Sequence, residues 1–292
     1  MSAERPLARA WLVDKPAGPT SHDVVRQIRQ RLPRGTKVGH AGTLDPFATG
    51  LLVILAGRAT RIADRVSGQS KRYRAVVQLG ARSETGDPEG PLTPGGPVPD
   101  AVRIAAAVDE LARTDTQQVP LYSAVRVDGE RLYALARRGE RPETPEREIR
   151  IGRLVLVDVD LDAGQVTLEA EVSKGTYVRQ LATDLCELLG CGAYCLALRR
   201  TGVGELDVVD AVPPDAVPDA PPVPLITLLT DIPTVVLDLP NIRALAHGRP
   251  LDLARPSGEV AVVAPDRHLV AIADSDGRQL RPVAVFTDPH AE

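Results

Sequence analysis

Apolar runs and helix-like spacing of apolar residues alternate along the first two thirds of the chain. The pattern of a β-strand, either an apolar run or every-second-residue alternation, occurs at residues 10–13, 71–80, 148–159 and 165–173. Helical spacing follows Ser21 and Asp100, whose side chains can cap helices, and a third helix opens after residue 173 and ends at Gly190. The residues expected to face inward on these helices are Val24, Val25, Ile28, Leu32, Val102, Ala105, Val108, Leu111, Tyr177, Leu181, Leu185 and Leu188.

Proline-rich segments divide the pattern. Residues 91–99 contain several prolines and glycines and predict a loop, and residues 210–224 predict either a stiff linker or an extended strap over the domain surface. After about residue 230, short apolar runs predict a small β-barrel, with strands at 235–239, 260–263, 269–273 and 283–286 and a helical piece at 241–246. The predicted domains are residues 1–230 and 231–292.

Composition narrows the class of protein. The chain has 292 residues, 43% hydrophobic and 25% charged, and its net charge of -4 gives no overall positive field for nucleic acid. Its apolar runs are too short to cross a bilayer and residues 1–5 carry no signal-peptide segment, so we expect a cytoplasmic protein without a membrane partner. Three cysteines with no Cys-x-x-Cys pair predict neither a disulfide framework nor a zinc site.

Residues 39–50, with the sequence GHAGTLDPFATG, are the most distinctive stretch of the chain. Asp45 stands between glycines and is followed by Pro46, so the backbone freedom of glycine and the fixed dihedral of proline shape a loop around one carboxylate. A turn-forming aspartate would have the same composition. The loop is not a phosphate-binding loop, because no Gly-Lys-Ser/Thr closes it.

This loop resembles, at every fixed position, the nucleophile motif G-H-x-G-x-L-D-P-x-A-T-G of the TruB family of tRNA pseudouridine synthases. Residues 117–139 are similar to the family's proline-containing segment and to the thumb that closes over RNA, although one proline of the family's pair is missing here. The resemblance covers residues 9 to about 205. The other stretches similar to family motifs are DKPAGPTS at 14–21, the Lys-x-Tyr strand at 71–73, SKGTYVR at 173–179 and LRR at 198–200.

The resemblance implies a fold and a chemistry. The fold would be α+β, a mixed and mainly antiparallel sheet flanked by helices, with a small C-terminal PUA-like RNA-binding barrel. The reaction would be isomerisation of uridine 55 in the T-arm loop of tRNA to pseudouridine, without cofactor or metal. Asp45 would be the covalent catalyst, by attack at C1′, by attack on the pyrimidine ring, or by a path through a glycal. Arg179 would pair with Asp45 and keep it ionised, and Tyr73 would stack on the uracil.

The resemblance also implies how the substrate is bound. A target base must leave its stack to reach the pocket, and His40 would fill the gap that it leaves. Lys15 is either a structural or phosphate-facing cation near the site or a solvated surface lysine. The remaining substrate-binding residues would be Tyr177, Leu198 and Lys174. We expect a monomer that acts on the T-arm stem-loop of tRNA without an obligate protein partner.

Two other functions have to be weighed against this one. Dyskerin-like relatives share the aspartate loop but depend on guide RNA and partner proteins, and the thumb-like segment at 117–139 favours the stand-alone type. An RNA-binding or RNA-folding protein would not need the chemistry. The retention of Asp45, Tyr73 and Arg179 argues against a protein that only binds, although a chaperone role could accompany catalysis.

Overall fold

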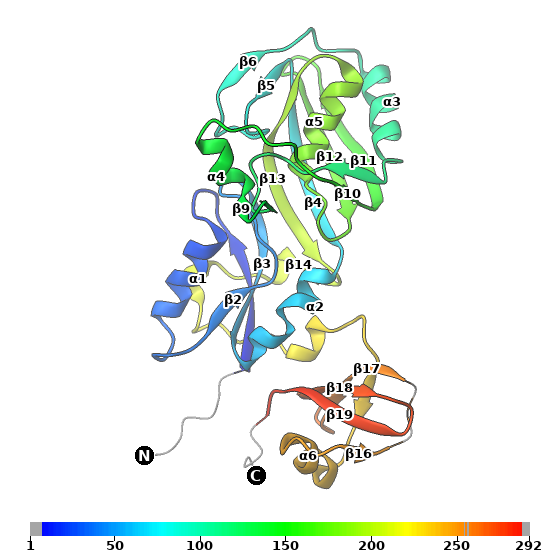
Figure 1. Ribbon diagram of the computed structural model, residues 1–292. Helices are drawn as coiled ribbons and strands as arrows, with labels where there is room; N and C mark the ends of the chain where they lie inside the picture. The colour runs from blue at the N-terminus through cyan, green and yellow to red at the C-terminus, as the bar shows by residue number, and fades with distance from the viewer. Residues whose placement is uncertain (1–7, 254, 256, 288–292) are drawn as a thin grey trace. The chain divides into compact units, whose positions relative to one another are not determined.

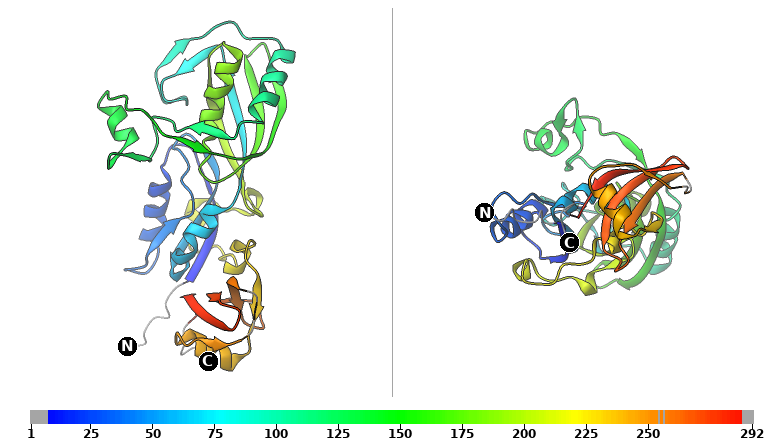
Figure 2. Two further views of the ribbon diagram at one scale, coloured as in Figure 1. Left: turned by 45° about the vertical axis from the view of Figure 1, so that its right-hand side comes forward. Right: turned by 90° about the horizontal axis from the view of Figure 1, so that it is seen from below.

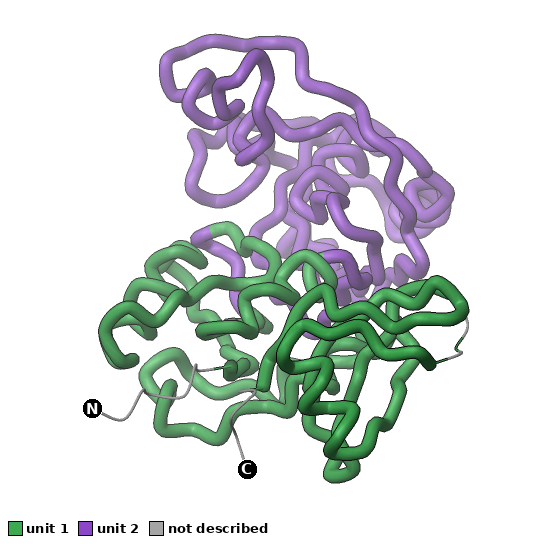
Figure 3. Tube along the Cα trace, turned by 60° about the horizontal axis from the view of Figure 1, so that its bottom comes forward, with its two compact units in different colours: residues 1–45, 50–67, 204–292 green, residues 46–49, 68–203 purple. Residues whose placement is uncertain are grey.

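The computed structural model describes residues 8–253, 255 and 257–287, which divide into two compact units (Figure 3). Unit 1 contains the chain up to residue 45, residues 50–67 and the chain from residue 204, and unit 2 contains residues 46–49 and 68–203. The expected domain boundary at 230 lies inside unit 1 and stays a prediction. The segment 1–5, in which we expect no signal peptide, and the last residues of the expected C-terminal domain lie outside the described residues.

The N-terminal part of unit 1 is an antiparallel sheet covered by a helix (Figure 1). The strand β1 (Ala8–Lys15) pairs along its whole length with β3 (Thr49–Gly57), and β2 (Val38–His40) pairs with β3 as well. The helix α1 (Ser21–Gln30) supplies the other half of the core. The buried residues of this core are Trp11, Val13, Val24, Val25, Ile28, Leu32, Val38, Leu52, Ile54, Ala56 and Val217.

Helix α1 is capped one residue earlier than its sequence pattern predicts. The N-cap is Thr20, not Ser21: the Asp23 amide donates to the Thr20 hydroxyl at 3.0 Å, and the Thr20 amide donates to the Asp23 carboxylate at 3.0 Å. This reciprocal arrangement satisfies two amides that the first helical turn leaves unpaired. Ser21 is buried instead, so its hydroxyl is available for a contact elsewhere in the core.

Residues 208–224 form a strap along the outer edge of β1, which confirms the strap alternative. The amide of Val212 donates to the Leu12 carbonyl and the amide of Val223 to the Ala10 carbonyl, both at 2.9 Å. Trp11 Nε1 donates to the Ala220 carbonyl at 2.9 Å. The strap therefore covers a sheet edge whose backbone groups would otherwise be open to pairing with another chain. Two short 3₁₀ turns lie in it, η2 (Val208–Asp210) and η3 (Pro214–Ala216).

Unit 2 is built on an antiparallel sheet with the strand order β13-β4-β12-β11. Its strands are β4 (Lys71–Leu79), β11 (Ile151–Asp160), β12 (Gln165–Val172) and β13 (Ala193–Val203). Helices α3 (Ala101–Leu111) and α5 (Val178–Leu189) lie side by side against this sheet (Figures 1 and 2). The predicted caps of these helices are confirmed: Asp100 accepts from the Arg103 amide at 2.8 Å, and Gly190 ends α5 with a φ of 71°.

Four details of unit 2 differ from the sequence pattern. Val102 and Leu188 were expected to face inward but are exposed, because the buried stripes run through Ile104 on α3 and Leu189 on α5. The predicted loop at 91–99 contains a short strand. The predicted strand at 148–159 is divided, because residue 148 ends one strand and β11 begins at Ile151. The strands concerned are β5 (Ala81–Ser83), paired with β6 (Leu92–Pro94), and β7 (Thr116–Gln118), paired with β10 (Glu146–Glu148).

The thumb-like segment 117–139 projects from the body of unit 2 (Figure 2). It consists of a hairpin, β8 (Arg126–Val127) and β9 (Glu130–Arg131), followed by the helix α4 (Leu132–Arg137). The segment has a small core of its own, in which Val119, Leu132 and Leu135 are buried. Tyr177, next to α5, packs against this core. The position of the thumb-like segment is therefore linked to the start of α5.

The C-terminal part of unit 1 is a curled five-stranded sheet with one helix, so the predicted small β-rich region is confirmed. The strand order is β15-β17-β18-β19-β16, and β15 pairs with β17 in parallel. The predicted strand at 235–239 ends early, because Asp238 caps a helix by accepting from the Asn241 amide at 3.1 Å. The elements are η4 (Leu225–Leu228), β15 (Thr234–Val236), α6 (Leu239–Ala246), β16 (Leu251–Asp252), β17 (Gly258–Val263), β18 (Leu269–Ser275) and β19 (Gln279–Val285).

Two arginines join this sheet to the segment after β3. That segment is helical, with η1 (Arg58–Ile62) followed by α2 (Ala63–Gly68). The short strand β14 (Leu206–Asp207) precedes the strap. Arg65 forms a two-pronged pair with Glu259, which raises the pKa of Arg65 and lowers that of Glu259. Arg58 donates to the carbonyl of Thr287 at 2.6 Å.

Trp11 lets us test how much the strap contributes to folding. Trp11→Phe removes the hydrogen bond to Ala220 and part of a buried side chain, and leaves the Ala220 carbonyl without that donor. We expect the free energy of unfolding to fall by about 1–3 kcal/mol. Denaturant unfolding followed by circular dichroism measures it. An unchanged midpoint would mean that the strap adds nothing to the stability of β1.

Lys71 opens β4 and is buried among positive charges. Burial, with the charges of Arg200 and Lys174 as smaller causes, lowers the pKa of Lys71 from its ordinary 10.5 to about 8. Lys71 Nζ donates to the Gln69 carbonyl at 2.6 Å. Because the pKa is lower in the folded chain, the unfolded chain binds more protons between pH 8 and 10.5, and folding stability must rise with pH in that window.

A comparison of the native protein with Lys71→Gln isolates this effect. Below pH 8 the native protein carries the full cost of the buried charge, and above it the cost is progressively relieved. The free energy of unfolding of the native protein should therefore rise relative to Lys71→Gln between pH 7.5 and 10. Lys37→Gln removes the same charge from an exposed position and is the matched control. A pH-independent difference between the native protein and Lys71→Gln would contradict the buried, depressed lysine.

Candidate active site

The loop that carries Asp45 is fixed by a buried serine. The amide of Leu44 donates to Ser21 Oγ at 2.8 Å, and Ser21 Oγ donates to the carbonyl of Leu44 at 3.1 Å. Both residues are buried, so one hydroxyl satisfies both backbone groups of the residue that precedes Asp45. Asp45 itself is half-buried. The sequence pattern assigned Ser21 to a helix cap and missed this role.

The division between the two units falls inside the same loop. Asp45 is the last residue of a unit 1 segment, and Pro46–Thr49 belong to unit 2. Within unit 2, Thr49 Oγ1 donates to the Leu198 carbonyl in a long hydrogen bond of 3.5 Å. Leu44 is thus fixed by Ser21 of α1, and Thr49 has a weak contact with the backbone of β13.

Arg179, in the first turn of α5, is a buried cation in a polar cradle. Its side chain is 4% exposed. One terminal nitrogen donates to the Thr85 carbonyl at 2.5 Å, and the other donates to the Tyr122 carbonyl at 2.9 Å. Arg179 Nε lies 3.6 Å from a carboxylate oxygen of Asp87, which is also buried. A buried guanidinium needs such partners, because its desolvation is costly when it is unpaired.

The active-site turn, residues 83–87, is shaped around this guanidinium. Gly86 has a φ of 75°, and a Cβ there would lie 3.3 Å from Arg179 Cγ, so both the backbone angle and the space favour glycine. The hydroxyl of Thr85 donates to Asp87 Oδ1 at 2.5 Å, and the amide of Glu89 donates to the same oxygen at 3.1 Å. The position of the Asp87 carboxylate is therefore fixed by contacts within the turn as well as by Arg179.

Gln117 fixes the start of α5 and was not identified from the sequence as a site residue. Its side chain accepts from the Tyr177 amide at 2.8 Å and donates to the Tyr177 carbonyl at 3.2 Å. It also donates to Asp184 at 3.3 Å, whose pKa is raised by burial. Gln117 is 3% exposed, so this buried amide sets the register of the helix that carries Arg179. The expected substrate residue Tyr177 is half-buried beside it.

Tyr73 and Leu198 lie on neighbouring strands of unit 2. Tyr73 on β4 stands opposite Arg200 on β13, and Ala75 stands opposite Leu198. Paired residues of an antiparallel ladder share one face, so Tyr73 and Leu198 are diagonal neighbours on that face. Leu198 is 7% exposed and Tyr73 is half-buried. The sheet thus brings an aromatic ring and an apolar side chain together, which is the combination that a flat base requires.

The three other expected substrate residues differ in their exposure. Lys174 is exposed in the connection between β12 and α5. Lys15, at the end of β1, has no exposed surface and donates to the Pro16 carbonyl at 2.8 Å, so the solvated-lysine reading is wrong. His40 ends β2, opposite Ile54 on β3, and is half-buried.

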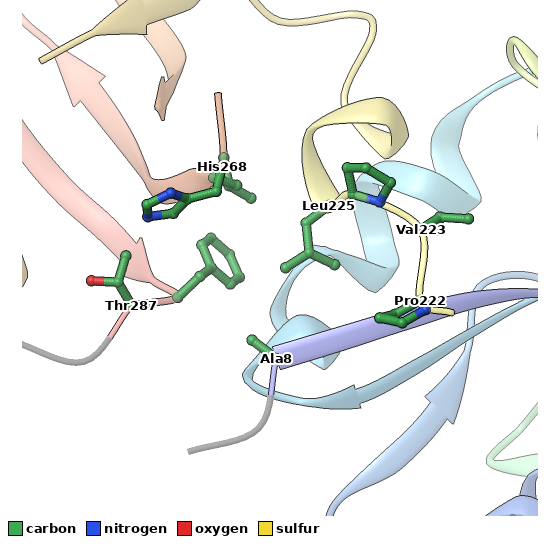
Figure 4. Close-up of a pocket in the computed structure, with 9 residues that line it drawn as sticks. Ala8, Pro222, Val223, Leu225, His268 and Thr287 are labelled. Atoms are coloured by element: carbon green, nitrogen blue, oxygen red, sulfur yellow. The ribbon is translucent and has the colours of Figure 1, made fainter. Parts of the chain in front are cut away.

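Unit 1 also contains a hollow. It has a volume of about 300 Å³ and is lined by the strap, the start of β1 and the end of the C-terminal sheet (Figure 4). Pro222 and Val223 of the strap line it together with Leu225 of η4 and His268. None of the expected site residues lines it. Within the described ranges, no three histidine, cysteine or acidic side chains gather as metal ligands would, and no helix is long and apolar enough to span a membrane.

The two units contain three kinds of side-chain group that are suited to a reaction on a base. Unit 2 holds a buried guanidinium on α5 and an aromatic–apolar pair on β4 and β13. Unit 1 presents a half-buried carboxylate, Asp45, on a loop that is pinned at the preceding residue. A carboxylate can act as a nucleophile, and a fixed guanidinium can orient it and balance its charge.

Two family models and several known proteins are similar to this chain. Residues 29–178 match the family model described as "TruB family pseudouridylate synthase (N terminal domain)", and residues 233–287 match "tRNA Pseudouridine synthase II, C terminal". The chain is 40% identical over 290 residues to the tRNA pseudouridine synthase B of Corynebacterium aurimucosum, covering 96% of this chain and 97% of that one. It is 39% identical over 296 residues to the enzyme of that name from Burkholderia mallei, with the same coverage.

A solved structure shares the fold at lower identity. It is described as an H/ACA RNP bound to a substrate RNA containing 2′-deoxyuridine, and it has a TM-score of 0.72 at 22% identity, covering 97% of this chain and 86% of that one. The strands and helices described above therefore form the α+β pseudouridine synthase fold. With a family match across more than half its length and relatives aligned along almost all of it, the chain belongs to the TruB family of pseudouridine synthases.

Proposed function

We propose that this protein isomerises a uridine of tRNA to pseudouridine. The observation that carries the proposal is the complete GHAGTLDPFATG loop in a chain that aligns end to end with enzymes named tRNA pseudouridine synthase B. The buried guanidinium on α5 and the aromatic–apolar pair of Tyr73 and Leu198 support it, because they are suited to a carboxylate nucleophile and a flat base. The proposed target is uridine 55 in the T-arm loop, where unpaired bases are accessible.

The reaction is an isomerisation and balances without a co-reactant. The N1–C1′ bond of the nucleoside breaks, the uracil rotates, and a C5–C1′ bond forms. The hydrogen on C5 is released as a proton, and N1 gains one. Asp45 is the proposed covalent catalyst, either at C1′ or on the ring, or the base that leads to a glycal.

Arg179 is the proposed partner of the Asp45 carboxylate. A guanidinium beside a carboxylate favours its ionised form and fixes its orientation. The cradle supports this role because it already holds the guanidinium by two carbonyls and Asp87, which limits the ways in which the side chain can turn. A preorganised charge of this kind stabilises a developing charge without rearrangement during the reaction.

The remaining site residues are proposed to bind the RNA. Tyr73 and Leu198 would contact the flipped uracil, and base–aromatic stacking is worth about 1–3 kcal/mol per base. His40 would occupy the space that the base leaves. The other proposed contacts are Tyr177, Lys174 and the buried cation Lys15. The proposal places a monomer in the cytoplasm that needs no partner protein, and the thumb-like segment favours this over guide-RNA dependence.

Asp45 is the first residue to test. Tritium release from tRNA labelled at uracil C5 measures the exchange of the C5 hydrogen directly. We expect release with the native protein and none above background with Asp45→Ala. Asp109→Ala, on the exposed side of α3, is the control and should release tritium at the native rate. No release by the native protein on bare tRNA would refute the stand-alone activity, and full release by Asp45→Ala would remove Asp45 from the chemistry.

Arg179 can be tested by separating binding from chemistry. Arg179→Lys keeps the charge but loses the two-pronged geometry, so we expect tRNA affinity within about threefold of native and a single-turnover rate lower by about 10²-fold or more. Filter binding and rapid quench measure the two quantities, and circular dichroism checks the fold. Parallel losses in both would indicate a binding role, and an unchanged rate would exclude Arg179 from the site.

A further inference from the structure

Glu84 connects the active-site turn to the thumb-like segment through its side chain. The hydroxyl of Tyr122 donates to Glu84 Oε1 at 3.2 Å. The guanidinium of Arg141, two residues beyond the end of the thumb-like segment, forms an ion pair with the same oxygen. Tyr122, near the start of the thumb-like segment, and Arg141, just beyond its end, therefore bind the same carboxylate, which belongs to the turn that holds Arg179. We call residues 120–141 the thumb-like region.

The same two segments are also joined through Arg179. The guanidinium binds the carbonyl of Thr85, next to Glu84, and the carbonyl of Tyr122, whose hydroxyl reaches Glu84. The carbonyl of Tyr122 therefore accepts from the buried Arg179, and its hydroxyl donates to the half-exposed Glu84. Any movement of the thumb-like region that pulls Tyr122 away from Glu84 must also disturb a hydrogen bond of Arg179.

The charges around Glu84 indicate that this contact is not part of an RNA-binding surface. RNA is held by cations, and an exposed carboxylate repels its phosphates. Glu84 is 42% exposed and Arg141 is 52% exposed, and the thumb-like region also presents the arginines 126, 131, 137 and 138. A residue kept there for binding would be neutral or positive. Glu84 is better explained by its two intramolecular partners.

We propose that Glu84 is a positioning residue that holds the thumb-like region closed on the active-site turn and thereby keeps the Arg179 cradle assembled. This rests on the proposed function. A half-exposed ion pair contributes little by itself, so the effect on the reaction arises from the shared attachment through Tyr122. Loss of Glu84 lowers the rate of the chemical step and does not weaken tRNA binding, because it removes a negative charge that opposes RNA.

The test compares Glu84→Gln with Glu140→Gln. Both remove one exposed carboxylate, but Glu140 contacts Arg138, at 2.7 Å, and not the active-site turn. For Glu84→Gln we expect the single-turnover rate of tritium release to fall by about three- to tenfold, with tRNA affinity unchanged or tighter. For Glu140→Gln we expect the native rate. Equal rates for the two variants, or weaker tRNA binding by Glu84→Gln, would overturn the proposal.

Two further variants identify the contact. Tyr122→Phe should lower the rate in the same way without a change in charge, and adding it to Glu84→Gln should lower the rate little more, because both remove one attachment. The exchange Glu84→Arg with Arg141→Glu restores the ion pair in reverse and should recover more of the rate than Glu84→Arg alone. Independent, multiplicative losses for Glu84→Gln and Tyr122→Phe would argue against a shared attachment.

Hydrogen exchange provides a readout that does not depend on activity. In the free protein, the amides of residues 120–141 should exchange about threefold or more faster in Glu84→Gln than in Glu140→Gln, because the thumb-like region opens more often. Equal exchange in the two variants would contradict the attachment. If the native protein released no tritium from tRNA while exchange differed as expected, the proposed function would fail and the attachment would stand.

Discussion

The burial of one guanidinium, that of Arg179, constrains several separate segments of unit 2. Arg179 is almost completely removed from water, and an unpaired buried cation would be too costly to retain. The chain offsets this cost with two carbonyls and a carboxylate from separate segments, the active-site turn and the base of the thumb-like segment. Those segments are far apart in sequence, so the requirement to surround the charge determines where each of them lies.

The supports of this cation are themselves well packed. Gln117 closes on the backbone of Tyr177 and so fixes the turn of α5 from which Arg179 projects. Gly86 allows the turn to approach the arginine side chain so closely that a Cβ would lie only 3.3 Å from Arg179 Cγ. Asp87 is oriented by Thr85 before it pairs with Arg179. The polar supports, Gln117 and Asp87, have their hydrogen-bond partners present, which is how a charged site is held rigid at low free-energy cost.

The loop of Asp45 in unit 1 is also held by a buried polar side chain. Leu44 is apolar and buried, but its backbone groups still need partners, and Ser21 supplies both. The helix that carries Ser21 packs on β1 and β3, and the strap covers the outer edge of β1. The half-buried carboxylate is therefore attached to a stable core and not to a freely moving turn. The position of this carboxylate depends on ordinary packing and hydrogen bonding at the neighbouring residues.

The sequence by itself determined the family, the motif residues and most of the elements. Local patterns were sufficient for the strands at 71–80 and 165–173 and for the caps at Asp100 and Gly190, because these depend on neighbours within a few residues. Proline content indicated the segment that forms the strap. Tertiary structure decided the rest. Val102 and Leu188 fit a helical stripe, but the packing of α3 and α5 places the stripe on other residues. Ser21, Gln117 and Glu84 have partners 23, 60 and 38 residues away, and no local pattern encodes a contact at that separation.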